Sequence, residues 1–88
     1  FGGTKTEPVG YHKKQINKGV LGEFSKIKEE FEEFEDAREQ NNPVMELVEL
    51  SDILGAIEAY TSKYNIDLNN LITMTRATQK AFKNGGRQ

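Results

Sequence analysis

Two pairs of acidic residues, each spaced three positions apart, constrain the fold of this chain more than any other feature. Glu30 and Glu33 form the first pair, and Glu49 and Asp52 form the second. On a helix, residues three positions apart project from neighbouring sites about one turn apart. The second pair falls in the same arc as apolar residues of its helix, where an ionised carboxylate is costly unless a cation or hydrogen-bond donors meet it. The two pairs therefore predict helices that share a site for a hard divalent cation, most fittingly Mg²⁺.

Length and composition narrow the class of protein further. A chain of 88 residues without cysteine forms one small domain, with neither disulfides nor a thiolate metal site. Such a domain buries only about 60–65% of its unfolded surface, so its own core is thin and oligomerisation is a common source of stability. The net charge of -2 argues against nucleic acid as the main partner. Because no apolar stretch could span a bilayer and no signal-peptide pattern is present, we expect a cytoplasmic protein without a membrane partner.

The order of breaks and apolar residues predicts an all-α fold. Residues 1–14 should form an irregular arm, because three glycines and Pro8 discourage regular structure there. The helical domain should then occupy residues 15–88, with its first helix over about residues 15–40. Apolar residues recur in that helix at alternating spacings of four and three, which gives one continuous stripe: Val20, Phe24, Ile27, Phe31 and Phe34.

Two further helices follow from capping signals. Asn42 can cap a second helix over about residues 43–63, and Pro43 suits its first turn, where a missing N–H costs nothing. Asp67 should cap a third helix that runs to about Phe82 and stops at the glycines that begin with Gly85. No strand pattern accompanies these helices.

Antiparallel packing of the first two helices would bring the acidic pairs together. The first pair lies about nine to twelve residues before the turn between the helices, and the second about seven to ten residues after it. The pairs therefore fall at similar heights and should face one another. A plainer interpretation of residues 29–36 stays open, in which this acidic run is a solvated face and three acids point well away from the apolar stripe: Glu29, Glu32 and Asp36. Glu49 or Asp52 could likewise pair with a lysine of another helix, or be less buried than their place on the helix suggests.

The remaining residues favour metal-assisted chemistry. His12 is the one histidine and lies in the irregular arm, so we interpret it as a surface residue and expect no histidine-based metal cluster or catalytic triad. The serines lack a nearby base, and no glycine-rich phosphate loop of the Walker type is present. An acidic cluster that binds Mg²⁺ suits hydrolysis of phosphate esters or anhydrides, in which the metal neutralises phosphate oxygens and activates water.

Two motifs carry a resemblance to a known family. The segment Glu29-Glu30-Phe31-Glu32-Glu33, followed after a turn by Glu49-Leu50-Ser51-Asp52, resembles the signature of the MazG-like all-α nucleoside triphosphate pyrophosphatases. The ending from Ala81 to Arg87 also resembles the Phe-x-x-Gly-x-Arg tail of some members. The family includes MazG proper, dimeric dUTPases, dCTP pyrophosphatases and the phosphoribosyl-ATP pyrophosphohydrolases of histidine synthesis.

The resemblance implies a fold, a metal site and a reaction. The fold would be three main helices in a four-helix-bundle-like core that is completed in a homodimer or homotetramer. The reaction would hydrolyse the bond between the α- and β-phosphates and give a nucleoside monophosphate and pyrophosphate. Glu30 or Glu33 would be the catalytic residue that positions the attacking water. The ligands of Mg²⁺, or of Mn²⁺ in its place, would be four acids: Glu30, Glu33, Glu49 and Asp52.

Basic residues of the third helix and the tail have two interpretations. Arg76, Lys80 and Lys83 follow one another along one face, with Arg87 beyond them. They could form a solvated face, or Lys80, Lys83 and Arg87 could reach a neighbouring subunit's site and bind phosphates. For the chain as a whole, a nucleoside triphosphate pyrophosphohydrolase is the leading hypothesis. The alternatives are a phosphoribosyl-ATP pyrophosphohydrolase and a non-catalytic helical dimerisation module, and base and sugar specificity stay open.

Overall fold

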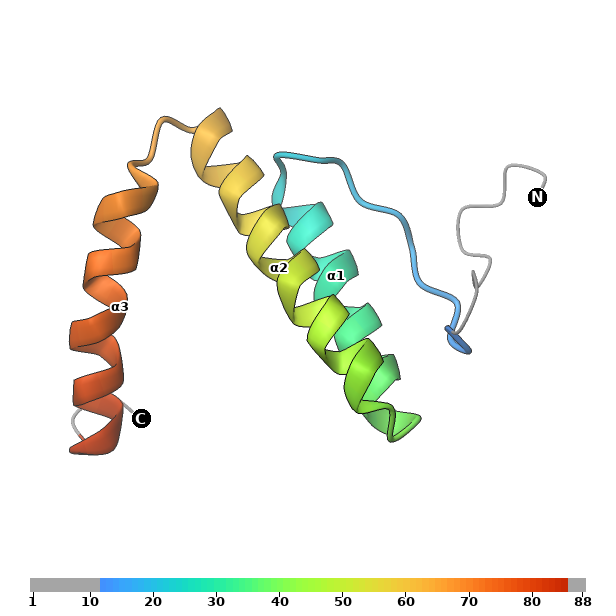
Figure 1. The fold of residues 1–88 in the computed structure, drawn as a ribbon. Helices are drawn as coiled ribbons and strands as arrows, with labels where there is room; N and C mark the ends of the chain where they lie inside the picture. Colours follow the sequence, from blue (N-terminus) through green and yellow to red (C-terminus); the bar gives the residue numbers. More distant parts are fainter. Residues whose placement is uncertain (1–11, 86–88) are drawn as a thin grey trace.

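The computed structural model describes residues 12–85 and shows an all-α fold. Its three helices are α1 (Phe24–Glu39), α2 (Pro43–Lys63) and α3 (Leu68–Lys83), and residues 12–85 contain no strand. Figure 1 shows α1 and α2 side by side, whereas α3 diverges from them beyond the turn that follows α2. The fold class expected from the sequence is confirmed.

The first helix begins later than the sequence predicted. It starts at Phe24 rather than near residue 15, and residues 12–23 form an extended arm that runs along α1 (Figure 1). Gly22 has a φ of +91°, a backbone conformation that residues with a Cβ rarely adopt, so a helix cannot continue through it. A Cβ at Gly19 would lie 2.2 Å from the carbonyl oxygen of Ser25. These glycines therefore set the arm closely against the start of α1 instead of lying inside a helix.

The predicted boundaries of the other helices are correct. The side chain of Asn42 accepts a hydrogen bond of 3.1 Å from the backbone N–H of Met45, and Pro43 is the first residue of α2. The side chain of Asp67 accepts one of 2.9 Å from Asn69 N–H at the start of α3. Helix α3 ends at Lys83, and Gly85 follows with a φ of +75°.

Contacts of Glu23 show that α1 and α2 are antiparallel. Glu23 is the N-cap residue of α1. Its carboxylate forms an ion pair with Lys63, the last residue of α2, and accepts a hydrogen bond of 2.9 Å from the Tyr64 hydroxyl. The beginning of α1 therefore lies at the end of α2, which is the relative direction that the acidic pairs require.

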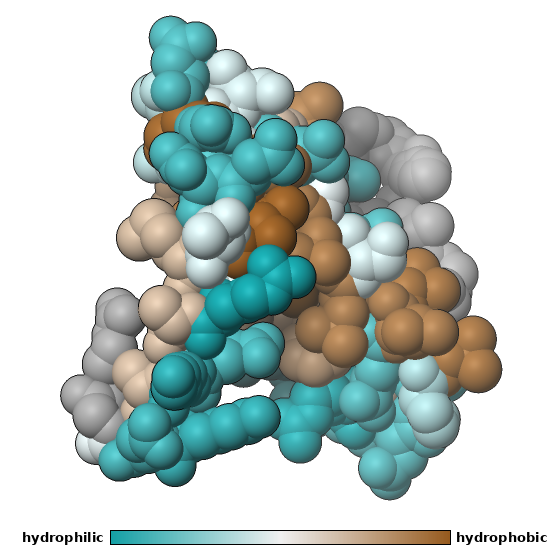
Figure 2. Space-filling model, turned by 60° about the vertical axis from the view of Figure 1, so that its left-hand side comes forward, coloured by the Kyte–Doolittle hydropathy of each residue, from teal (hydrophilic) through white to brown (hydrophobic). Residues whose placement is uncertain are grey.

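Few apolar side chains are buried in this single chain. Among residues 12–85, the buried apolar residues come from the arm, α1 and α2: Ile16, Ala37, Met45 and Ala56. Helix α3 has no buried residue, and its Ile72 and Phe82 are 47% and 57% exposed. Figure 2 shows apolar atoms gathered openly in the middle of one face. The four-helix-bundle-like core is therefore not complete within residues 12–85 of one chain, and its completion by a partner stays a prediction.

Within the described residues, no helix combines the length and the apolar character that crossing a membrane requires.

Candidate metal centre

Helices α1 and α2 bring the two acidic pairs together. Each of the four acids offers one carboxylate oxygen, and all four oxygens lie within 4.8 Å of one another. We call this group the carboxylate cluster; Glu30 and Glu33 contribute to it from α1, and Glu49 and Asp52 from α2. The facing arrangement expected from the register of the two helices is thus present in the structure.

The carboxylate cluster is buried on one side and open on the other. Glu49 is 1% exposed and Glu30 is 6% exposed, whereas Glu33 is half-buried and Asp52 is exposed. Asp52 therefore lies at the rim of the cluster and not within an apolar face, which agrees with the alternative that it is less buried than its place on the helix suggests. A ligand that reached the cluster from solvent would meet Asp52 first.

The electrostatics of the cluster favour a bound cation. Burial, together with the neighbouring charges of Glu30 and Glu49, raises the pKa of Glu33 to about 9. Burial and the same two neighbours also raise the pKa of Asp52. Glu30 Oε1 is buried and has no hydrogen-bond partner among the described residues. Since a buried acceptor without a donor is costly, a divalent ion at the cluster would satisfy this oxygen and offset the repulsion.

Lys26 compensates part of the negative charge at the edge of the cluster. Its Nζ lies 3.0 Å from Glu30 Oε2 and 3.1 Å from Glu29 Oε1. Burial alone would lower the pKa of Lys26, but its hydrogen bonds to the two glutamates raise it above the usual value. One oxygen of Glu30 is therefore held by Lys26, while the other remains within the buried part of the cluster.

Two acids that the sequence assigned to a solvated face are in fact buried against the extended arm. Glu29 is 3% exposed and accepts a hydrogen bond of 2.8 Å from the backbone N–H of Gly19. Asp36 is 2% exposed and accepts hydrogen bonds of 2.9 Å from Lys13 N–H and 3.0 Å from Gln40 Nε2. The interpretation of Glu29 and Asp36 as solvent-facing was wrong, because the arm covers that side of α1.

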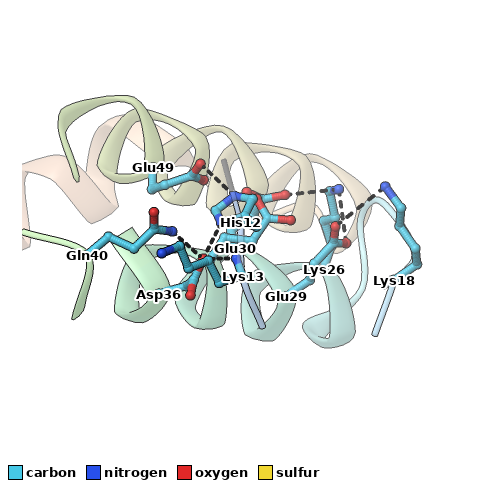
Figure 3. A network of polar contacts seen from close by, with 10 residues as sticks. His12, Lys13, Lys18, Lys26, Glu29, Glu30, Asp36, Gln40 and Glu49 are labelled. Atoms are coloured by element: carbon cyan, nitrogen blue, oxygen red, sulfur yellow. Dashed lines mark hydrogen bonds and ion pairs between the residues drawn. The ribbon is translucent and has the colours of Figure 1, made fainter. Parts of the chain in front are cut away.

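His12 is not the surface residue that the sequence suggested. Its side chain is 9% exposed; Nδ1 lies 2.9 Å from Asp36 Oδ2, and Nε2 lies 3.1 Å from Glu49 Oε2 and 3.5 Å from Glu33 Oε1. Figure 3 shows the ring between the two helices, with Asp36 on one side and Glu49 on the other. His12, Glu33 and Glu49 form a second group whose ligand atoms lie within 4.8 Å of one another. The extended arm therefore belongs to the site.

The candidate phosphate-binding residues lie elsewhere. Lys80 and Lys83 are exposed on α3, and α3 diverges from the helix pair that holds the cluster (Figure 1). Arg87 lies outside the described residues. Within one chain, the structure does not bring Lys80 and Lys83 to the carboxylate cluster, and their role in phosphate binding stays a prediction.

Comparison with known proteins adds a family to this geometry. A protein-family model described as phosphoribosyl-ATP pyrophosphohydrolase matches residues 2–77. Neither curated proteins nor solved structures give a match. The matched range contains His12, all four acids of the cluster and both helices that carry them. The chain therefore belongs to the phosphoribosyl-ATP pyrophosphohydrolase family and is a nucleotide pyrophosphohydrolase of the MazG-like superfamily.

Proposed function

We propose that this chain hydrolyses the bond between the α- and β-phosphates of phosphoribosyl-ATP in the presence of Mg²⁺, giving phosphoribosyl-AMP and pyrophosphate. The observation that carries the proposal is the carboxylate cluster, with four acidic oxygens from two facing helices within 4.8 Å. The family match favours phosphoribosyl-ATP over an ordinary nucleoside triphosphate, which the sequence alone had placed first. An ordinary triphosphate contains the same bond and is the second candidate substrate.

The donor set fits a hard divalent cation. All four side chains of the carboxylate cluster offer oxygen, which is the donor that Mg²⁺ and Mn²⁺ accept, and the buried Glu30 Oε1 has no other partner among the described residues. When bound, such a cation neutralises phosphate oxygens and polarises the attacking water. Because Asp52 is exposed, a substrate phosphate and water could approach the cluster from that side.

Glu33 is the better candidate for accepting a proton from the attacking water. One oxygen of Glu30 is held by Lys26 at 3.0 Å, whereas Glu33 is half-buried and lies nearer the solvent. Burial and neighbouring charges raise the pKa of Glu33 to about 9, and a bound cation would lower it again. A carboxylate whose pKa is raised above its ordinary value is suited to general-base catalysis near neutral pH.

We further propose that the active enzyme is a homodimer or homotetramer. The exposed apolar residues of α2 and α3 support this, because a folded monomer rarely leaves so many large apolar side chains in water. They include Val44, Leu47, Leu54, Ile72, Met74 and Phe82. In such an assembly, Lys80, Lys83 and Arg87 of one subunit would bind phosphates at the carboxylate cluster of another.

A non-catalytic dimerisation module is the weaker alternative. A surface that only holds two chains together has no need for buried acids, because each costs free energy unless it is compensated. Glu30 and Glu49 are both almost completely buried within the cluster. Lys26 and His12 compensate one oxygen of each acid, but the buried Glu30 Oε1 has no hydrogen-bond partner among the described residues, and a ligand would satisfy it.

The test is an assay with a panel of substrates. The protein is incubated with Mg²⁺ and with phosphoribosyl-ATP or one of the ribo- and deoxyribonucleoside triphosphates, and the products are separated by chromatography. We expect pyrophosphate from phosphoribosyl-ATP at the highest rate, a loss of at least 100-fold in Glu49→Gln, and no loss in Glu58→Gln. Glu58 is a matched control because it is an exposed glutamate of the same helix. Faster release from an ordinary triphosphate would transfer the assignment to that substrate, and no release from any would overturn it.

A further inference from the structure

The extended arm connects α1 and α2 at the carboxylate cluster through a single side chain. His12 contacts Asp36 of α1 with one ring nitrogen and Glu49 of α2 with the other, at 2.9 and 3.1 Å. Asp36 is not a member of the carboxylate cluster, whereas Glu49 is its most deeply buried member. The ring therefore lies between a structural acid and a candidate metal ligand (Figure 3).

The other contacts of Asp36 fix the orientation of the His12 ring. Asp36 Oδ2 already accepts hydrogen bonds from the backbone N–H of Lys13 and from Gln40 Nε2. The carboxylate therefore acts as an acceptor, and His12 Nδ1–H must be the donor in the bond between them. This bond points Nε2 towards the carboxylate cluster, where Glu49 Oε2 is 3.1 Å away and Glu33 Oε1 is 3.5 Å away.

The arm that carries His12 is itself held in place. At its other end, Gly19 N–H donates a hydrogen bond of 2.8 Å to the buried carboxylate of Glu29. Between these two ends, Ile16 is buried among the few apolar residues of the core. His12 is therefore delivered to the cluster by a segment with three separate anchors, and its position does not depend on one hydrogen bond.

We propose that His12, oriented by Asp36, is a positioning residue for the pyrophosphohydrolase site. It holds the Glu49 side chain, which has three rotatable bonds, in the conformation in which its carboxylate joins the other three acids. Partners of this kind commonly set the orientation of metal ligands, and their loss costs about 10–100-fold in metal affinity or activity. The inference rests on the proposed function, since it assigns Glu49 to the metal site.

The test measures metal binding separately from catalysis. Mn²⁺ is the probe, and its binding is followed by the loss of the electron paramagnetic resonance signal of the unbound ion. The variants are His12→Ala, His12→Gln, which keeps an N–H donor for Glu49, and Asp36→Asn, which removes the negative charge facing the ring and replaces one carboxylate oxygen by an NH2 donor. Lys14→Ala is the matched control, because Lys14 lies on the same arm and pairs at 2.8 Å with Glu39 on the exposed side. Circular dichroism checks that each variant is helical.

We expect His12→Ala to weaken Mn²⁺ binding at least tenfold and Asp36→Asn to weaken it several-fold. His12→Gln should recover most of the affinity, and the Mn²⁺ affinity of Lys14→Ala should lie within twofold of that of the wild-type protein. Unchanged or tighter binding in His12→Ala would overturn the proposal. A directly bound nitrogen in the pulsed resonance spectrum of the Mn²⁺ complex would also overturn it, by making His12 a ligand. If His12→Ala loses its helices, the decision rests on Asp36→Asn, in which unchanged Mn²⁺ affinity would overturn the proposal.

The activity assay distinguishes this inference from the proposed function. If the unchanged protein releases no pyrophosphate from any substrate yet binds Mn²⁺ in a His12-dependent way, the enzymatic assignment fails and the positioning role stands. If activity is lost in Glu49→Gln but neither activity nor Mn²⁺ binding changes in His12→Ala, the positioning role fails and the enzymatic assignment stands.

Discussion

The imidazole of His12 and the carboxylate of Asp36 are joined by a 2.9 Å contact between residues 24 positions apart in the sequence. The contact makes the extended arm part of the same folded unit as α1 and α2. The arm contacts three buried acids of the two helices, since Glu29, Asp36 and Glu49 are each less than 4% exposed. A unit with so many buried acids and so small an apolar core should depend strongly on the cations and donors that meet those acids.

Mg²⁺ should raise the melting temperature of the protein. A ligand that binds only the folded state at ten times its dissociation constant stabilises that state by about 1.4 kcal/mol. For a domain of this size, the melting temperature should rise by roughly 6–11 °C. The rise is measured by differential scanning fluorimetry, and it should be absent in Glu49→Gln and retained in Glu58→Gln. An unchanged melting curve at millimolar Mg²⁺ would contradict the metal site.

Metal binding should strengthen as the pH rises from 6.5 towards 9. The pKa of Glu33 is raised to about 9 without a cation, so Glu33 holds a proton at neutral pH that a metal must displace. The raised pKa of Glu33 also affects the stability of the metal-free protein. The stability that protonated Glu33 contributes is fully present below its ordinary pKa of 4.5 and is lost as the pH rises through about 9. Calorimetric titration with Mg²⁺ in buffers of different ionisation enthalpy would show the released proton. A proton release that is the same in Glu33→Gln would contradict the assignment.

The sequence predicted α2 and α3 well, but it placed the start of α1 too early and predicted the surroundings of the site less well. Asn42 with Pro43, and Asp67, act within a few residues of their own position, so local rules locate α2 and α3 accurately. The facing of the acidic pairs followed from helix register alone. What the sequence did not reveal is the return of the arm along α1, because a coil has no periodicity that would indicate which helix face it covers.

One signal could have located the arm. Glu29 and Asp36 are seven residues apart and therefore lie on one side of α1, and each is buried beside a donor from the arm. The segment just upstream of the helix is basic and contains a histidine, so its charge is complementary to two acids on one side of the helix. A helical wheel drawn for α1 alone could not show this, since it assigns every acid outside the apolar stripe to solvent.

Low pH should weaken the attachment of the arm to α1, because Asp36 becomes protonated. Burial alone would raise the pKa of Asp36, but hydrogen bonds from His12, Lys13 N–H and Gln40 lower it below its ordinary value of 3.8. The resulting stability is present above that ordinary value and is lost as the pH falls through the lower, folded-state pKa. Thermal melts between pH 5 and pH 2 should therefore decline less steeply in Asp36→Asn, which should itself cost about 1–3 kcal/mol at pH 7. Equal slopes in the two proteins would contradict this role.

Two glycine substitutions should change stability in opposite directions. Gly22 has a φ of +91°, so Gly22→Ala should destabilise the protein by about 1–2 kcal/mol. Gly55 lies inside α2, and a Cβ there would meet nothing within 4 Å, so Gly55→Ala should stabilise it by roughly 0.5–1 kcal/mol. Urea denaturation of both variants gives the comparison. A stabilising Gly22→Ala would show that the arm does not require this backbone turn.

Mixing two inactive variants should restore activity if basic residues of one subunit serve the cluster of another. Glu49→Gln damages the cluster, whereas the double variant Lys80→Ala, Lys83→Ala leaves the cluster intact and removes the proposed phosphate ligands of α3. In a homodimer, a mixed pair would contain one site with both an intact cluster and intact lysines. Random exchange makes about half of the dimers mixed, and each mixed dimer has one working site out of two. About a quarter of the wild-type activity should therefore return. The exchange is made by brief dilution and reconcentration, and pyrophosphate release is then measured. If the lysine variant is inactive and mixing restores nothing, the lysines act on their own chain's cluster or on its folding.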